Sequence, residues 1–271
     1  GFTVISLVHE LENIIRDNGL EGHADAIAAH ADKIIFPAAM VQTSFQRFTG
    51  PIGDKAVICP QGAYKINRFK DEAAHQSAGN NLRKSLGLPS TARIILGVGY
   101  ADHRKGYDLF IQACEALAAP QAHIVFVWMG HHDPDTARRY KPRTDALVKA
   151  GNLMLPGRVD DTDMFYAGAD AYLLTSREDP YPSTVLEALD VGLPVIGFEG
   201  ATGTTELIRG HHGHIVPAFD VDAMVAATKR ALITGGPNMR RDIAASFHSR
   251  DDVSFPGYVR RLLELMGEPV P

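Results

Sequence analysis

Two carboxyl groups eight positions apart are the side chains of this chain best placed to do chemistry. Asp179 and Glu187 lie at the two ends of the run DPYPSTVLE, which follows an apolar segment at residues 171–176. This order predicts a buried strand, a proline-rich turn that carries Asp179, and a helix that carries Glu187. In an open α/β sheet, ligands bind where the carboxyl ends of strands meet loops and helix N-termini. Carboxylates without metal-ligand spacing around them most naturally accept hydrogen bonds from sugar or ribose hydroxyls.

A purely structural interpretation of this run competes with the first. The segment TVLE at residues 184–187 fits the capping box, in which a glutamate at the third helical position bonds back to the amide of the capping residue. Glu178 and Asp179 can likewise belong to a solvated turn before Pro180. On the local pattern alone, both interpretations stay open.

A cationic glycine-rich loop, GVGYADHRKG at residues 97–106, follows a second apolar segment and precedes a predicted helix. Its glycines let the backbone approach a ligand closely. Arg104 and Lys105 bring positive charge beside a helix N-terminus, which is a natural site for a phosphate. The third glycine of the dinucleotide fingerprint is absent. A tight turn with solvated cations is the alternative interpretation.

A third loop, GFEGATGTTE at residues 197–206, also follows an apolar segment and opens a helix. Free backbone amides at Gly203, Thr204 and Thr205 are predicted to cradle a diphosphate, with help from the helix dipole. An ordinary glycine loop with threonine caps fits the same residues.

The histidines give weaker signals. His9 ends the first apolar segment, where a lone histidine is more often structural than catalytic. The pair at 131–132 and the group at 211, 212 and 214 lack the regular spacing of metal ligands, so no metal site is predicted.

Composition bounds the class of protein. The chain has 271 residues, of which 45% are hydrophobic and 22% charged, as in ordinary globular domains. A net charge of -5 and the lack of a lysine- or arginine-rich run argue against nucleic-acid binding. Cys59 and Cys114 lie in apolar surroundings and are expected to be reduced thiols of a cytoplasmic protein. Neither a membrane-spanning run nor a signal peptide is expected.

Apolar segments alternate with helical ones almost throughout, which predicts parallel sheets covered by helices on both faces. The predicted strands are residues 4–8, 33–36 and 56–59, and, after a linker at 60–69, residues 93–98, 123–128, 152–155, 171–174, 195–198 and 214–216. The predicted helices are residues 72–86, 107–117, 135–150, 162–167, 184–191, 204–208 and 221–233, and a tail at 239–247 and 251–266 broken near 254–257.

Taken in order, the three loops resemble those of retaining glycosyltransferases of family 4, which have two Rossmann-like domains in the GT-B architecture. The family's E-x7-E and L-E-A-x3-G-x-P-V-I signature is matched from Asp179 and Glu187 through residue 196, with aspartate as the first acid. Its G-R-L-x3-K-G loop corresponds to residues 99–106, where Lys105 matches the family lysine and Tyr100 replaces the usual arginine. Its G-x-x-E loop corresponds to residues 203–206. The resemblance runs from His9 to the end of the chain.

The resemblance implies roles for individual residues. Lys105 would pair with the donor diphosphate, Glu187 would bond the ribose hydroxyls, and Asp179 would hold hydroxyls of the transferred sugar. His9 would face the sugar across the cleft between the domains. The other donor-binding residues implied are Gly99, Tyr100, Arg104, Arg158, Glu178, Pro180, Tyr181, Pro182, Ser183, Thr184, Gly203, Thr204, Thr205 and Glu206.

It also implies an organisation. Residues 1–62 would be the C-terminal remnant of the N-terminal, acceptor-side domain, and residues 63–250 the nucleotide-sugar domain. Residues 251–271 would form a helix that crosses back to the N-terminal domain. Because the chain opens inside a strand-like run, we expect a fragment that lacks the start of the first domain and that is weakly active or inactive alone.

The activity implied is transfer of a hexose from a nucleotide-diphosphate sugar to a glycan or lipid-linked acceptor, with retained anomeric configuration. Neither a metal nor a cofactor is expected, and the missing N-terminal part would provide any peripheral membrane association. Two alternatives stay open: a catalytically silent nucleotide-sugar-binding module, which Tyr100 and Asp179 favour, and a nucleotide-sugar epimerase.

Overall fold

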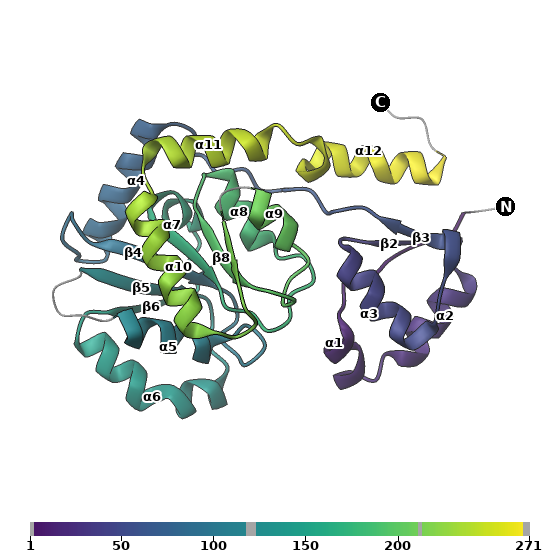
Figure 1. The fold of residues 1–271 in the computed structure, drawn as a ribbon, viewed down its shortest axis with the longest axis horizontal. Helices are drawn as coiled ribbons and strands as arrows, with labels where there is room; N and C mark the ends of the chain where they lie inside the picture. The colour runs from purple at the N-terminus through teal and green to yellow at the C-terminus, as the bar shows by residue number, and fades with distance from the viewer. Residues whose placement is uncertain (1–2, 118–122, 211–212, 268–271) are drawn as a thin grey trace.

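The chain folds around two parallel β-sheets (Figure 1). The computed structural model describes residues 3–117, 123–210 and 213–267. The first sheet joins β1 (Ile5–Leu7), β2 (Lys33–Phe36) and β3 (Ala56–Ile58) in that order. The second joins six strands in the order β6-β5-β4-β7-β8-β9. The predicted α/β architecture is confirmed.

The smaller sheet packs against α2 (Glu21–His30) and α3 (Ala39–Thr49), and α1 (Glu12–Asp17) contacts α3. Ile34 and Phe36 of β2 are fully buried and meet Phe45 of α3. This unit is the purple part of Figure 1, and it lies beside the carboxyl-end loops of the larger sheet.

The larger sheet reverses its winding between β4 and β7. From β4 (Arg93–Val98) the chain adds β5 (Ile124–Met129) and β6 (Leu153–Gly157) on one side. It then returns to place β7 (Ala171–Leu174) on the other side of β4, followed by β8 (Val195–Phe198) and β9 (His214–Val216). Ligands of open α/β sheets bind outside the carboxyl ends of the strands at such a switch point.

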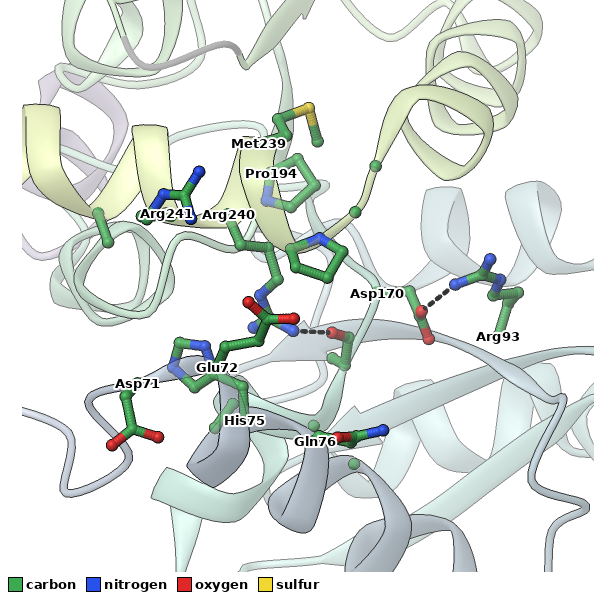
Figure 2. A pocket seen from close by; sticks show the side chains of 18 of the residues that line it. Asp71, Glu72, His75, Gln76, Arg93, Asp170, Pro194, Met239, Arg240 and Arg241 are labelled. Carbon is green, nitrogen blue, oxygen red and sulfur yellow. Dashed lines mark hydrogen bonds and ion pairs between the residues drawn. The ribbon is translucent and has the colours of Figure 1, made fainter.

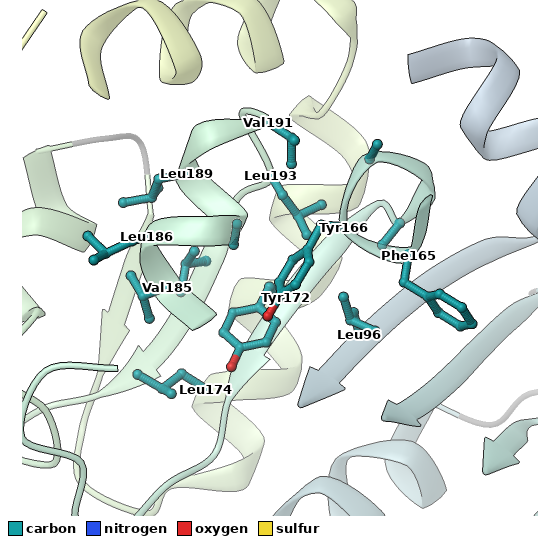
Figure 3. Close-up of a cluster of buried hydrophobic side chains, with 14 of the residues drawn as sticks. Leu96, Phe165, Tyr166, Tyr172, Leu174, Val185, Leu186, Leu189, Val191 and Leu193 are labelled. Atoms are coloured by element: carbon teal, nitrogen blue, oxygen red, sulfur yellow. The ribbon is translucent and has the colours of Figure 1, made fainter. Parts of the chain in front are cut away.

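Helices cover both faces of this sheet, as its continuously apolar strands require. They are α4 (Glu72–Ser85), α5 (Tyr107–Leu117), α6 (Pro134–Lys149), α7 (Thr162–Gly168), α8 (Ser183–Asp190), α9 (Thr205–Gly210), α10 (Val221–Thr234) and α11 (Pro237–His248). α12 (Phe255–Met266) instead extends beyond this sheet (Figure 1). Successive strand residues point to opposite cores: Leu96 contributes to one cluster and Ile95 to the other. Figure 3 shows the first cluster, with Tyr166 and Tyr172 between β7, α7 and α8.

The C-terminal tail differs from the predicted break at 254–257. α11 ends at His248, a short 3-10 turn covers Asp251–Val253, and α12 begins at Phe255. Ser254 caps α12 by accepting a hydrogen bond from the Gly257 amide at 3.0 Å. Proline is tolerated in a first helical turn, so Pro256 starts the helix and does not break it.

The tail also touches the segment that joins the two sheets. The Ala63 amide donates to the Val253 carbonyl at 2.8 Å, and α12 continues toward the smaller sheet (Figure 1). The domain limits 1–62, 63–250 and 251–271 stay predictions. Cys59 and Cys114 are buried free thiols. Within the described ranges, no helix combines the length and the apolar character that crossing a bilayer requires.

Candidate active site at the switch point

Lys105 and Asp179 meet directly at the switch point. The ammonium Nζ of Lys105 lies 2.6 Å from Oδ2 of Asp179, and their side chains are 16% and 7% exposed. The Ser176 hydroxyl donates to the same carboxylate oxygen at 3.1 Å. The structure therefore brings together a lysine after β4 and an acid after β7, as the sequence predicts.

The loop after β4 is held in place by tight backbone contacts. Gly106 has a φ of +66°, and a Cβ there would lie 1.8 Å from the Thr175 carbonyl oxygen. The Thr175 hydroxyl donates to the Lys105 carbonyl at 3.0 Å, and the Asp102 carboxylate accepts from the Lys105 amide at 2.7 Å. Gly99 accepts a hydrogen bond from the Trp128 indole at 3.1 Å. These contacts fix the backbone from which the Lys105 side chain extends.

Arginines tie the acidic turn to this loop. The Arg104 guanidinium donates to the Glu178 carbonyl at 3.1 Å, and the Arg177 amide donates to the Arg104 carbonyl at 2.8 Å. Arg177 also forms a bidentate pair with Asp108 of α5, with both bonds at 2.7 Å. Arg104 thus supports the Glu178 backbone as well as carrying charge. Tyr100 is 47% exposed.

The third loop pairs with the acidic turn, which corrects one prediction. The Gly203 amide donates to the Pro180 carbonyl at 3.1 Å, and the Thr204 amide donates to the Thr202 hydroxyl at 3.2 Å. A Cβ at residue 203 would lie 2.1 Å from the Pro180 oxygen, so glycine is needed for this close approach. The prediction of free amides at Gly203 and Thr204 is therefore wrong, because the turn itself uses them.

Besides Tyr100, two other predicted donor-binding residues have solvent-exposed side chains. Glu206 is 84% exposed and pairs with Arg209 at 2.7 Å. Arg158 is 74% exposed and lies 3.8 Å from Asp160. Tyr181, in contrast, is buried. The roles of these residues stay predictions.

Glu187 is not part of a capping box. α8 begins at Ser183 after Pro182, and no side chain of the described residues caps it. The Thr184 hydroxyl accepts a hydrogen bond from the Tyr172 hydroxyl at 2.9 Å, which fixes the first turn. Glu187 therefore lies beyond the capping positions, and the capping interpretation is wrong.

The electrostatic surroundings of Glu187 differ from those of the Lys105–Asp179 pair. Burial raises the pKa of the Glu187 carboxyl; the ammonium of Lys65 opposes this rise, and the carboxylates of Asp163 and Asp190 add to it. These neighbours come from the linker, α7 and α8. Glu187 is not among the residues that line the cavity beside Lys105 and Asp179, and the ribose-binding role implied for it stays a prediction.

Between the two sheets lies an open cavity of about 570 Å³. The smaller unit lines it with His9, Glu10, Ile14, Asp17 and Asn18, and the larger one with Arg104, Lys105, Asp179, Pro180 and Tyr181. His9, which the family resemblance implies to face the sugar across a cleft, lines this cavity together with Lys105 and Asp179, and its role stays a prediction. Burial lowers the pKa of the His9 imidazole, so the neutral form predominates at neutral pH.

Glu10, which lines this cavity, and Asn13, which joins the two units, were not predicted from the sequence. Burial raises the pKa of the Glu10 carboxyl, with Arg104 opposing the rise and Glu178 adding to it. The Glu178 carboxylate accepts a hydrogen bond from the Asn13 amide of α1 at 3.1 Å, which joins the two units. The position of Glu10 directly after His9 in the sequence was a signal that this carboxyl lies at the cavity. No motif pointed to Asn13.

The other histidines that the structure describes form no metal-binding cluster. Over the described ranges, no three His, Cys, Asp or Glu side chains lie close enough to hold a metal ion. His132 packs its ring edge-on against Tyr107, with centroids 5.0 Å apart. His211 and His212 lie outside the described residues.

A family profile and several known proteins match parts of this chain. The sequence profile "Glycosyl transferases group 1" matches residues 79–247. The alpha-galactosylglucosyldiacylglycerol synthase of Streptococcus pneumoniae is 35% identical over 137 residues, which are 48% of this chain and 35% of that protein. The mannosylfructose-phosphate synthase of Agrobacterium fabrum is 29% identical over 167 residues, 58% of this chain and 36% of that protein. The matched segments thus span about a third of these two relatives.

Solved structures share the fold. Anabaena Alr3699/HepE, crystallised with UDP and glucose, superposes with a TM-score of 0.81 over 98% of this chain and 72% of that one, at 16% identity. WaaG, a glycosyltransferase involved in lipopolysaccharide biosynthesis, superposes with a TM-score of 0.73 over 96% of this chain and 75% of that one, at 18% identity. The predicted GT-B architecture is therefore confirmed.

Proposed function

Because the chain belongs to the group 1 glycosyl transferases, we propose that it binds a nucleotide-diphosphate sugar and transfers its hexose to a glycan or lipid-linked acceptor. The donor lies at the carboxyl ends of β4, β7 and β8, and the acceptor enters from the cavity that His9 and Glu10 line. The diacylglycerol synthase named above supports a lipid-linked acceptor. The complex of Alr3699/HepE with UDP and glucose makes a uridine nucleotide the first donor to test.

The observation that carries this proposal is the position of Lys105. Its ammonium extends from a rigid loop at the switch point into the cavity between the units, where it already lies beside Asp179. Lys105 then neutralises the donor diphosphate, and Asp179 accepts hydrogen bonds from the sugar. Glu187 in α8 accepts hydrogen bonds from the ribose hydroxyls.

The reaction proceeds with retention and without a metal ion. The bond between the anomeric carbon and the diphosphate oxygen breaks as the acceptor hydroxyl approaches the same face of the sugar. The hydroxyl proton passes to the leaving phosphate oxygen, and the acceptor oxygen forms the new bond. Lys105 and the amides at the start of α8 stabilise the charge that gathers on the diphosphate, so the main contribution of the protein is preorganised electrostatics.

Two measurements test the proposal in order. Thermal shift with UDP, GDP and ADP and their hexose conjugates identifies the donor, since a ligand at 100 times its Kd stabilises the fold by about 2.7 kcal/mol. Transfer of radiolabelled sugar to diacylglycerol or a glycan acceptor then follows, with the anomeric product assigned by NMR. Lys105→Ala is expected to lower the transfer rate about 100-fold or more. Inversion at the anomeric carbon would refute the retaining mechanism.

The replacement of the usual arginine by the exposed Tyr100 supports a second candidate, a nucleotide-sugar-binding module without turnover. This module binds the donor as the enzyme does. Donor binding that depends on Lys105 and Glu187, together with no transfer in the presence of any acceptor, would favour the module. Isomerised donor in the absence of acceptor would favour an epimerase.

A further inference from the structure

A second large cavity opens at the opposite edge of the six-stranded sheet, where the strands begin. Its volume is about 640 Å³. The start of α4, the first residues of β4 and the segments before β7 and β8 form one part of its wall, and the end of α10 and α11 form the rest (Figure 2). None of the residues that line the candidate active site lines this cavity. The two sites are therefore separate.

One wall of this cavity carries more positive than negative charge. Arg83 and Arg93 share a single carboxylate, Asp170, at 2.6 and 2.8 Å. Arg240 donates to the carbonyl oxygens of Ala169 and Tyr166 at 3.1 and 3.3 Å. Within the part of the chain that the structure describes, Arg240 forms no ion pair with a carboxylate. Arg83, Arg93 and Arg240 thus line this part of the cavity together with one carboxylate, Asp170.

The guanidinium of Arg240 remains a cation in this setting. Burial lowers its pKa to about 10; Asp170 opposes this effect, and Arg83 adds to it. At neutral pH the group therefore stays protonated. Figure 2 shows Arg240 extending from α11 toward the sheet, with Asp170 and Arg93 on the same wall. Of the other acids that line the cavity, Asp71 caps α4 and Glu72 lies in its first turn, where both complement the helix N-terminus. Asp190 lies 2.8 Å from His248 and 3.8 Å from Lys70.

Apolar side chains also line this cavity, chiefly from α10 and α11. They are Pro194, Leu232, Pro237, Met239 and Ala244. A ligand that fills this cavity therefore meets both cations and hydrocarbon. Ligand pockets of this kind combine an apolar lining with a few polar groups that fix the orientation of the ligand. A free inorganic anion would pair with the arginines but leave the apolar part of the lining exposed to water.

We propose that this cavity is a second ligand site, which binds a small organic anion through Arg83, Arg93 and Arg240 and buries an apolar body against α10 and α11. The site lies on the far side of the sheet from the proposed donor site and does not depend on that function. A carboxylate, sulfonate or phosphate on an aromatic or aliphatic body has the required chemistry.

The probe for this proposal is 8-anilinonaphthalene-1-sulfonate, an aromatic anion whose fluorescence rises on transfer from water to an apolar site. We expect saturable binding of one probe per chain. N-phenyl-1-naphthylamine, which has the same rings without the sulfonate, is expected to bind at least about tenfold more weakly, since hydrogen bonds to charged groups contribute 1.5–3 kcal/mol. Saturating UDP is expected to leave the probe bound. Equal binding of the neutral compound, or displacement by UDP, would overturn the proposal.

Two substitutions locate the probe. Ala245→Trp, at an exposed position on the cavity rim, should block it, and Arg93→Gln should raise its Kd about tenfold. The matched controls are Ala146→Trp and Arg138→Gln on α6, which are exposed and do not line the cavity. Melting curves by circular dichroism verify that all four variants fold. Undiminished binding to both rim variants would show that the probe lies elsewhere and refute the site.

Discussion

Replacing Lys105 with methionine is expected to destabilise the fold as well as weaken nucleotide binding. The ion pair with Asp179 spans 2.6 Å between side chains that are 16% and 7% exposed. At an effective dielectric constant of 20, the gross attraction is about 6 kcal/mol, and the desolvation of both charges offsets much of it. Removing one partner of a buried pair typically costs 3–5 kcal/mol. Because Ser176 still bonds the carboxylate, we expect a loss of about 2–3 kcal/mol.

A double-mutant cycle measures the interaction itself. Urea unfolding of the wild type, Lys105→Met, Asp179→Asn and the double variant is expected to give a coupling energy of about 2 kcal/mol. The control is the Arg138–Asp135 pair of α6, with side chains 78% and 85% exposed and atoms 2.9 Å apart. The same cycle on this control should give less than about 0.5 kcal/mol. Equal coupling energies for the two pairs would refute the reasoning from burial.

Measuring the affinity for UDP separates the role of the Lys105 ammonium in stability from its role in donor binding. Lys105→Met should weaken UDP about tenfold or more even at temperatures where the variant is fully folded, because one charge-assisted bond to the diphosphate is lost. Asp179→Asn should leave UDP affinity nearly unchanged, since the proposed partner of Asp179 is the sugar. Unaltered UDP affinity in folded Lys105→Met would contradict the proposed position of the diphosphate.

Three further predictions follow from particular contacts. Gly106→Ala should cost at least about 2 kcal/mol in urea unfolding, because its Cβ would clash with a backbone oxygen; Gly151→Ala, with a similar positive φ in open space, should cost only about 1 kcal/mol. Burial lowers the pKa of His75, so the unfolded chain binds the proton more readily and stability falls as the pH drops below about 6.5; His75→Gln should flatten this fall between pH 7.5 and 5.5. Glu178→Ala should speed hydrogen exchange of the Asn13 amide, measured by NMR, and unchanged exchange would argue against the contact between the units.

Much of the fold was predictable because its strands are continuously apolar. The strands at 33–36, 93–98, 171–174, 195–198 and 214–216 agree with the predicted bounds, and the others shift by one or two residues. A strand buried on both faces contains a run of apolar side chains that ends abruptly at a glycine or polar loop. Helix termini were less clear, since Pro256 lies inside the first turn of α12 although the sequence treats it as a breaker.

In the candidate site, only the meeting of Lys105 and Asp179 was predictable, because each residue lies in a loop directly after a predicted strand. The approach of Lys105 to Asp179 follows from parallel strands that end at the same edge, which the alternating pattern already implies. The surroundings of Glu187 depend on Lys65 in the linker and Asp163 in α7, and these are fixed by tertiary packing. The hydrogen bond from the Gly203 amide to the turn depends on a β-bridge between residues 179 and 202, which no local sequence pattern indicates.

The Lys105–Asp179 pair explains how the site can be ready before a donor arrives. Folding already removes both charges from water and fixes them on loops held by Gly106 and Gly203, so donor binding needs little further ordering of the protein. The ammonium retains donor capacity for a phosphate, and the carboxylate retains lone pairs for sugar hydroxyls. A donor that bridges the two therefore adds partners without breaking the pair, and this preorganisation is what a stabilised leaving diphosphate requires.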